Sequence, residues 1–283
     1  MTTYGMVIDV SRCTGCYNCF LACRDEHVGN DQRPIAASQP ESGHKWIDVL
    51  EHERGKLPRV RVDHVPLPCQ QCKDASCVSR APDGAVYRRE DGIVIIDPEK
   101  AKGHPQIVAS CPYRVIHWNA AEQVAQKCTF CAHLLDQGWK EPRCVEACPT
   151  EALVFGDLDD PTSRISQLLK SKATEELHPE FGLAPSVRYV RLPKRFVSGE
   201  IALADRMSEP AAGVRVTLHD GTKAHDGATD LYGDFAFDEL DAGASYRLRI
   251  AAPGYRPREI DIGARKDVDL GTIVLEPVSA GTP

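Results

Sequence analysis

The chain has 283 residues, an apolar fraction of 42% and a formal net charge of −7, enough for two domains of ordinary size with packed cores. The acidic balance excludes the basic stripe or patch that nucleic-acid binding requires, so we expect no nucleic-acid partner. Apolar runs such as Ile93-Val94-Ile95-Ile96 are strand-sized. They fall far short of the roughly 20 residues that span a bilayer, and we expect no direct insertion into a membrane.

The N-terminal stretch from Met1 to Met6 has no basic region, apolar core or cleavage site, so we expect no secretory or twin-arginine signal. We expect a cytoplasmic protein. The alternative is a periplasmic protein that is exported together with a partner bearing the signal. The chain holds twelve cysteines. In the cytosol these predict metal ligands or catalytic groups rather than disulfides, because thiols are kept reduced there.

The first cysteine motif follows the N-terminus closely and has the spacing C-x2-C-x2-C-x3-C. It consists of Cys13, Cys16, Cys19 and Cys23. Gaps of two residues let a tight loop present three thiolates to one four-iron cluster. The fourth cysteine of such a run binds the neighbouring cluster in two-cluster ferredoxins. Zinc sites are built mainly from paired C-x2-C knuckles, so a zinc-stabilised interaction protein is the weaker interpretation.

Three further motifs complete the cysteine inventory. The second is Cys69, Cys72 and Cys77; the third is Cys111 before Pro112; the fourth is Cys128, Cys131, Cys144 and Cys148 before Pro149. No cysteine follows Cys148, and this change in composition predicts a cysteine domain over residues 1–155.

Residues 156–194 are predicted to form a partly helical connector that docks on a partner. The spacing of Ile165, Leu168 and Leu169 indicates a helix over Ser163 to Lys172. Extended chain is expected around residues 187–190. Residues 279–283 are expected to form a flexible tail.

Short alternating strands are predicted over residues 195–278, and Gly–Asp clusters separate them. The alternation is clear at Val214, Val216 and Leu218, and it recurs at Phe235, Phe237, Tyr246, Leu248, Ile250, Ile260 and Ile262. This pattern is typical of a small β-sandwich. The expected fold class is therefore α+β: two ferredoxin-like modules followed by an all-β sandwich.

The motifs pair as in two-cluster ferredoxins, with the first joined to the fourth and the second to the third. Each motif gives three ligands to one cluster and one ligand to its partner's cluster. The expected ligand sets are Cys13, Cys16 and Cys19 with Cys148; Cys128, Cys131 and Cys144 with Cys23; and Cys69, Cys72 and Cys77 with Cys111. All twelve thiols are used once, which predicts three four-iron clusters.

The same arithmetic defines a fourth set that lacks thiols altogether. Its positions are occupied by Ala81, Ala101, His104 and Ile107. Imidazole binds iron in some clusters, but His104 has three non-ligands as companions and is interpreted as a surface or gap-filling residue. One cluster of the two modules is therefore expected to be lost.

The cysteine domain resembles the iron–sulfur subunits of molybdopterin oxidoreductases of the dimethyl sulfoxide reductase family. The resemblance rests on the stretches Tyr4 to Cys23, Asp91 to Pro98, Lys127 to Cys131 and Arg143 to Pro149. The loss of one ligand set and the added C-terminal sandwich are similar to the small subunits of pyrogallol–phloroglucinol transhydroxylases and resorcinol hydroxylases. The sandwich itself resembles prealbumin-like or carboxypeptidase-regulatory-like domains.

The resemblance implies an electron-transfer subunit with no catalytic residues of its own. Its partner would be a large catalytic subunit that carries molybdenum bound to two molybdopterin guanine dinucleotides, in a heterodimer or a higher oligomer, together with a redox acceptor. The implied substrates are polyhydroxylated aromatic compounds, in hydroxylation or transhydroxylation. The alternatives are a related oxidoreductase with a non-aromatic substrate and a stand-alone electron carrier.

Overall fold

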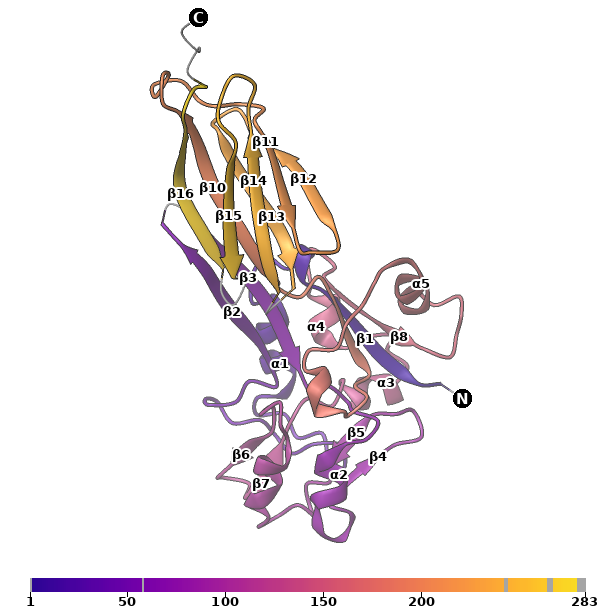
Figure 1. Ribbon diagram of the computed structural model, residues 1–283. Helices are drawn as coiled ribbons and strands as arrows, with labels where there is room; N and C mark the ends of the chain where they lie inside the picture. Colours follow the sequence, from indigo (N-terminus) through magenta and orange to yellow (C-terminus); the bar gives the residue numbers. More distant parts are fainter. Residues whose placement is uncertain (1, 58, 242–243, 264–266, 279–283) are drawn as a thin grey trace, which may run out of the picture. The chain divides into compact units, whose positions relative to one another are not determined.

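A computed structural model describes residues 2–57, 59–241, 244–263 and 267–278. The chain forms two compact units (Figure 1). The first comprises Met1–His52 and Asp63–Leu192, and the second comprises Glu53–Val62 and Pro193–Pro283. The tail expected at residues 279–283 lies outside the described residues.

The first unit combines short helices with short strands. Its α-helices are α1 (Asn18–His27), α2 (Ser76–Arg80), α3 (Ala132–Asp136), α4 (Arg143–Glu146) and α5 (Arg164–Ser171). Its 3-10 helices are η1 (Val10–Arg12), η2 (Pro82–Gly84), η3 (Pro105–Ser110) and η4 (Pro179–Phe181). Its strands are β1 (Tyr4–Asp9), β4 (Val86–Arg88), β5 (Val94–Ile96), β6 (His117–Asn119), β7 (Val124–Gln126), β8 (Leu153–Asp157) and β9 (Val187–Val190). Among the described residues, no helix is long and apolar enough to cross a membrane.

Strand β1 is the centre of a three-stranded sheet of order β8-β1-β9, and it is buried on both faces. It pairs antiparallel with β8 and parallel with β9. Met6 and Ile8 point into the core that contains the cysteines. Val7, on the opposite face, packs with Ile165 of α5 and Val190 of β9. Alternation across the strand therefore lets one short segment support two apolar layers.

The predicted helix and extended segment after residue 156 are both confirmed, as α5 and β9. Helix α5 begins at a Ser163 cap, whose side chain accepts a hydrogen bond from the backbone N–H of Ser166 at 3.2 Å. Such a cap satisfies one of the free donors at a helix start. Residues 156–192 are part of the first unit, because β9 completes its central sheet.

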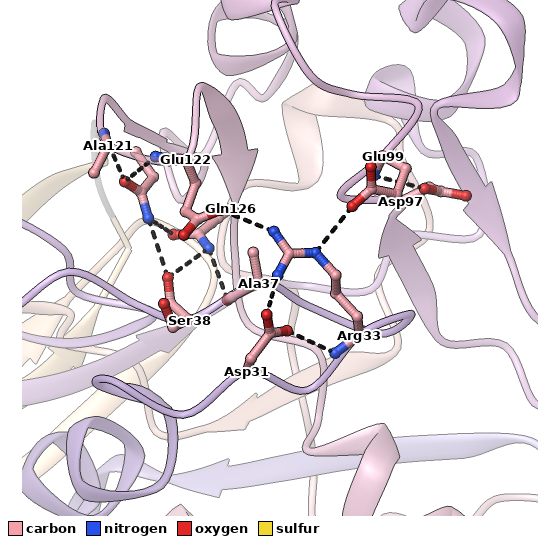
Figure 2. A network of polar contacts seen from close by, with 10 residues as sticks. Asp31, Arg33, Ala37, Ser38, Asp97, Glu99, Ala121, Glu122 and Gln126 are labelled. Atoms are coloured by element: carbon pink, nitrogen blue, oxygen red, sulfur yellow. Dashed lines mark hydrogen bonds and ion pairs between the residues drawn. The ribbon is translucent and has the colours of Figure 1, made fainter.

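The segment between α1 and strand β2 (Ile47–Lys56) has little regular structure, and polar side chains fix it in place (Figure 2). Arg33 forms ion pairs with Asp31, with Glu99 at 3.0 Å and with Glu122 at 2.8 Å. The amide of Gln126 donates to the carbonyl of Ala37 at 2.8 Å. Much of this network is open to water, so its ion pairs define loop positions more than they add stability.

The second unit contains the two-sheet sandwich predicted from the alternating pattern. Its strands are β10 (Arg195–Leu203), β11 (Arg215–His219), β12 (Ala224–Ala228), β13 (Asp234–Leu240), β14 (Ser245–Ala251), β15 (Arg258–Gly263) and β16 (Val268–Leu275). The sheets have the orders β13-β10-β16 and β12-β11-β14-β15 (Figure 1). Both contribute to one core, which includes Val197 and Phe235 from the first sheet and Val216 and Leu248 from the second.

One piece of this unit comes from the N-terminal half of the chain. Strands β2 (Ile47–Lys56) and β3 (Arg59–Pro68) form a hairpin, and its tip, Glu53–Val62, belongs to the second unit. The Arg54 guanidinium pairs with Asp267 at 3.2 Å and lies 5.6 Å from the ring centre of Phe196. The Arg61 guanidinium lies 4.8 Å from the same ring centre. The sequence pattern gave no sign of this arrangement.

Candidate iron–sulfur centres

The structure brings Cys13, Cys16, Cys19 and Cys148 together as one group of thiols. Burial, together with the neighbouring thiols Cys13, Cys148 and Cys16, raises the pKa of Cys19 to about 12. Burial also raises the pKa of Cys13, with added effects from Cys148 and Cys16. Cys148 lies more than a hundred positions away in the sequence, yet it is close enough to act on Cys13 and Cys19. These four residues are called the first set below.

A second set consists of Cys23, Cys128, Cys131 and Cys144. Burial raises the pKa of Cys144, and the charges of Cys131, Cys128 and Cys23 add to the effect. The pKa of Cys23 is raised by burial and then by Cys128 and Cys131. Helices α1 and α4, which carry Cys23 and Cys144, pack against each other.

A third set consists of Cys69, Cys72, Cys77 and Cys111. Burial raises the pKa of Cys72, and the charges of Cys69, Cys111 and Cys77 raise it further. Neighbouring thiols thus act on one another within each of the three groups, and Cys69 of the third group also acts on Cys128 of the second. All twelve are free thiols.

The second set has neighbours in both of the other sets. The first and second sets meet at α1, where the charge of Cys19 acts on Cys23 one helical turn away. The second and third sets meet at Cys128, whose pKa is affected by Cys69. The second set thus lies next to both of the others.

Left-handed backbone positions recur in the cysteine loops. Gly15 has φ +68° and Tyr17 φ 60° in the first motif, Gln71 has φ 47° in the second, and Phe130 and Cys131 have φ 53° and 51° in the fourth. Residues other than glycine rarely adopt this conformation, and such positions cluster at functional sites. Here they bend each loop sharply enough for closely spaced thiols to converge.

Gly15 is required for its positive φ and also because the space beside it is filled. A β-carbon at this position would overlap the imidazole ring of His64. The small residue between Cys13 and Cys16 therefore lets the loop lie directly against β3.

The donor chemistry of the sets fits four-iron clusters. Backbone N–H groups donate to the sulfurs, from Phe130 to Cys128 at 3.4 Å and from Ala152 to Cys148 at 3.2 Å. Such bonds are typical partners of cluster thiolates. Among the described residues, no three His, Cys, Asp or Glu side chains close around a point for one metal ion. A cubane needs no such point, because each of its irons takes a different thiolate. Thiols with raised pKa values lose their protons when a metal binds them.

Three of the four positions of the set without thiols lie within or beside the apolar core. Ala101 is fully buried and Ile107 is 1% exposed, and both belong to the main core cluster. Ala81 packs against the same cluster. The ring of His104 is within 3.0 Å of the Gln106 amide at its Nδ1. Aliphatic side chains thus occupy positions where a cluster would require thiolates.

Two buried basic side chains lie beside the cysteines. His27 is on the same face of α1 as Cys19 and Cys23, and its Nε2 is 3.7 Å from the sulfur of Cys131. Burial lowers the pKa of His27 to about 3, so the imidazole is neutral. Lys127 is 2% exposed. The sequence shows that Lys127 precedes a cysteine, but not that its side chain is buried. For His27, its position one helical turn after Cys23 was the only indication that it lies near the cysteines.

Family models match both parts of the chain. The model of the 4Fe-4S dicluster domain matches residues 60–158, and the model of the carboxypeptidase regulatory-like domain matches residues 197–276. With the grouped cysteines, these matches and the relatives described next define the class. The chain belongs to the iron–sulfur electron-transfer subunits of the molybdopterin oxidoreductases.

Within that class, the chain is 41% identical to the pyrogallol hydroxytransferase small subunit of Pelobacter acidigallici over 282 residues, covering 97% of this chain and 100% of that protein. It is 33% identical to the arsenate respiratory reductase iron–sulfur subunit of a Shewanella species, covering 66% of this chain and 95% of the relative. It is 38% identical to the protein NrfC of Escherichia coli, covering 70% of this chain and 83% of the relative. Homologues of this kind are subunits of larger complexes, so a catalytic partner subunit is implied.

Proposed function

We propose that this chain carries three four-iron clusters and transfers electrons for a catalytic subunit that acts on polyhydroxylated aromatic compounds. The observation that carries the proposal is the 41% identity with the pyrogallol hydroxytransferase small subunit, which extends over both units. The grouping of the cysteines supports the number of clusters. The proposed ligands are the first set (Cys13, Cys16, Cys19, Cys148), the second set (Cys23, Cys128, Cys131, Cys144) and the third set (Cys69, Cys72, Cys77, Cys111).

The loss of a fourth cluster is part of the proposal. Ala101 and Ile107 have no donor atoms in their side chains, and they contribute to the apolar core instead. His104 alone does not supply the four ligands that a cubane takes. The third set is therefore proposed as the one cluster site that remains in its module.

The catalytic partner is proposed to hold molybdenum bound to two molybdopterin guanine dinucleotides. The two subunits would form a heterodimer or a higher oligomer that works with a redox acceptor. We expect residues 156–194 and the sandwich to serve docking and stability rather than chemistry, since a sandwich fold alone implies no activity.

The residues of this chain would hold the clusters, orient the sulfurs that bind them and shield them from water. Twelve thiolates would bind the clusters, which supply one-electron transfer when bound. Backbone N–H groups such as those of Phe130 and Ala152 orient the sulfurs. Buried residues such as Phe130 and Val145 exclude water from the second set. Solvent exclusion and hydrogen bonding are two of the factors that set cluster potentials.

Metal analysis tests the number of clusters directly. Anaerobically purified complex should contain about twelve irons and about twelve acid-labile sulfides per copy of this chain. A Cys111→Ala variant should lose up to about four of the irons and leave the first two sets filled. About sixteen irons in the wild type would contradict the loss of the fourth cluster. A few zinc ions without sulfide would contradict the whole assignment.

The type of reaction is tested by supplying substrates selectively. The purified complex is assayed on pyrogallol and resorcinol, with an artificial electron acceptor or with a tetrahydroxybenzene co-substrate. Turnover that needs the acceptor indicates a hydroxylase, whereas turnover with the co-substrate alone indicates a transhydroxylase. Turnover of neither compound would contradict an aromatic substrate and favour a related oxidoreductase.

A further inference from the structure

The cation of Lys127 lies in the interior of the first unit, at 2% exposure. Its Nζ donates to the carbonyl oxygens of Val94 and Cys128, the latter at 3.1 Å. Within the described residues, no carboxylate forms an ion pair with this lysine. A buried charge without a counter-charge is costly, so something must compensate the ammonium.

The neighbouring polar groups around Lys127 are neutral. The Gln71 amide donates to the Cys128 carbonyl at 3.1 Å, and its Oε1 accepts from the Val94 backbone N–H at 2.8 Å. Gln71 therefore fixes the two segments whose carbonyls receive the lysine. These dipoles place the ammonium, but they carry no net charge that would balance it.

The lysine lies between segments that carry two different sets. It directly precedes Cys128 of the second set and donates to that residue's carbonyl. Gln71, which stands between Cys69 and Cys72 of the third set, donates to the same carbonyl. The ammonium is therefore placed where those two sets adjoin.

We infer that Lys127 is the internal counter-ion of the clusters at the second and third sets, and that it raises the reduction potential of both. The inference rests on the proposed function, because it requires clusters at those sets. Four thiolates outweigh the positive charge of a cubane core, and reduction adds one more negative charge. A fixed cation in a poorly solvated interior stabilises the more negative, reduced form. The first set includes none of the residues that surround Lys127, so its potential should not depend on this charge.

The test is a redox titration of the complete complex with its catalytic partner, followed by electron paramagnetic resonance. Lys127→Gln removes the charge and keeps an amide that can donate to a carbonyl. Lys127→Arg keeps the charge. Lys73→Gln is the matched control, because Lys73 also neighbours a proposed ligand, Cys72, but is exposed to solvent. Water and salt screen an exposed charge far more strongly than a buried one.

In Lys127→Gln, two of the three cluster signals should shift together to more negative potentials while the third stays in place. Lys127→Arg should move them back toward the wild type, and Lys73→Gln should leave all three unchanged. Iron loss in Lys127→Gln that Lys127→Arg restores also supports a need for charge. Iron loss in both variants, or unshifted potentials in Lys127→Gln with full iron content, would overturn the inference. A wild-type complex without about twelve irons would instead refute the proposed function.

Discussion

Replacement of Arg54 by methionine tests how the hairpin tip is held in the second unit. The guanidinium has 14% of its surface exposed, and its partner Asp267 has 8%. It also donates to the carbonyl of Lys194 and lies over the Phe196 ring. Methionine preserves much of the apolar length and removes the charge.

The expected loss of stability follows from these contacts. A hydrogen bond to a charged group contributes about 1.5–3 kcal/mol, and a cation–π contact adds about 0.5–2 kcal/mol. Removing the cation also leaves the Asp267 carboxylate with fewer partners, so a total near 2–4 kcal/mol is expected. For a unit of about 100 residues, each kcal/mol lowers the melting temperature by about 4–8 °C. Arg54→Met should therefore lower the melting temperature of the second unit by at least about 8 °C.

The assay is differential scanning calorimetry, with the visible absorbance of the clusters recorded in parallel. The matched control is Arg61→Met. Arg61 contacts the same ring and pairs with Asp238, but its side chain is 40% exposed and that of Asp238 is 45% exposed. An exposed pair contributes about 0–1 kcal/mol, so a much smaller change is expected. Equal melting temperatures for Arg54→Met and the wild type would refute the reasoning.

Three other substitutions test separate features of the first unit. Lys172→Met should lower the free energy of unfolding by about 1–2 kcal/mol, because it leaves the buried Asp9 carboxylate with fewer donors. The figure is kept low because the Lys172 side chain is half exposed and water screens its charge. Burial alone would raise the Asp9 pKa, but hydrogen bonds from Lys172 and Ser11 lower it overall. The stabilisation is therefore present above the unfolded pKa of about 3.9 and is lost only as the pH falls through the lower folded value. The gap in melting temperature between the two proteins should stay constant from pH 8 to pH 5, and a gap that closes in that range would contradict this account. Gly15→Ala should remove about a third of the iron, because the added β-carbon would overlap His64 and the residue has a positive φ. The control is Gly29→Ala, which has a similar φ but open space around it, and it should keep its full iron content in the same metal analysis. Ile107→Ala should cost about 2–4 kcal/mol in chemical denaturation and leave the iron content unchanged, and loss of about four irons would show that the position supports a cluster.

The iron–sulfur class of the first unit could be predicted because ligand spacing is a local and stringent pattern. The strands around Val216 and Leu248 were also predictable, since one buried face and one exposed face give a clear period of two. In both cases the pattern lies in the residues that form the structure: the cysteines of the motifs and the alternating residues of the strands.

The hairpin β2–β3 was not predictable, because its tip is rich in charged residues and would be interpreted as a loop. Its partners Phe196 and Asp267 lie far away in the sequence. The burial of Lys127 was hidden for a related reason. A lysine beside a cysteine has the same local sequence whether it is exposed, as Lys73 is, or enclosed by distant segments.

The way the cysteine sets are divided along the chain has a consequence for biosynthesis. In the proposed ligand sets, Cys19 must wait for Cys148, and Cys23 must wait for Cys144, before either set is complete. At ordinary rates of translation this interval is on the order of ten seconds. During that time the ribosome exposes reactive thiols in a segment that also lacks β8 and β9, the two partners of β1. Insertion of iron and sulfide is therefore expected to follow synthesis of the whole first unit, and the nascent chain would depend on a reducing, chaperoned environment until then.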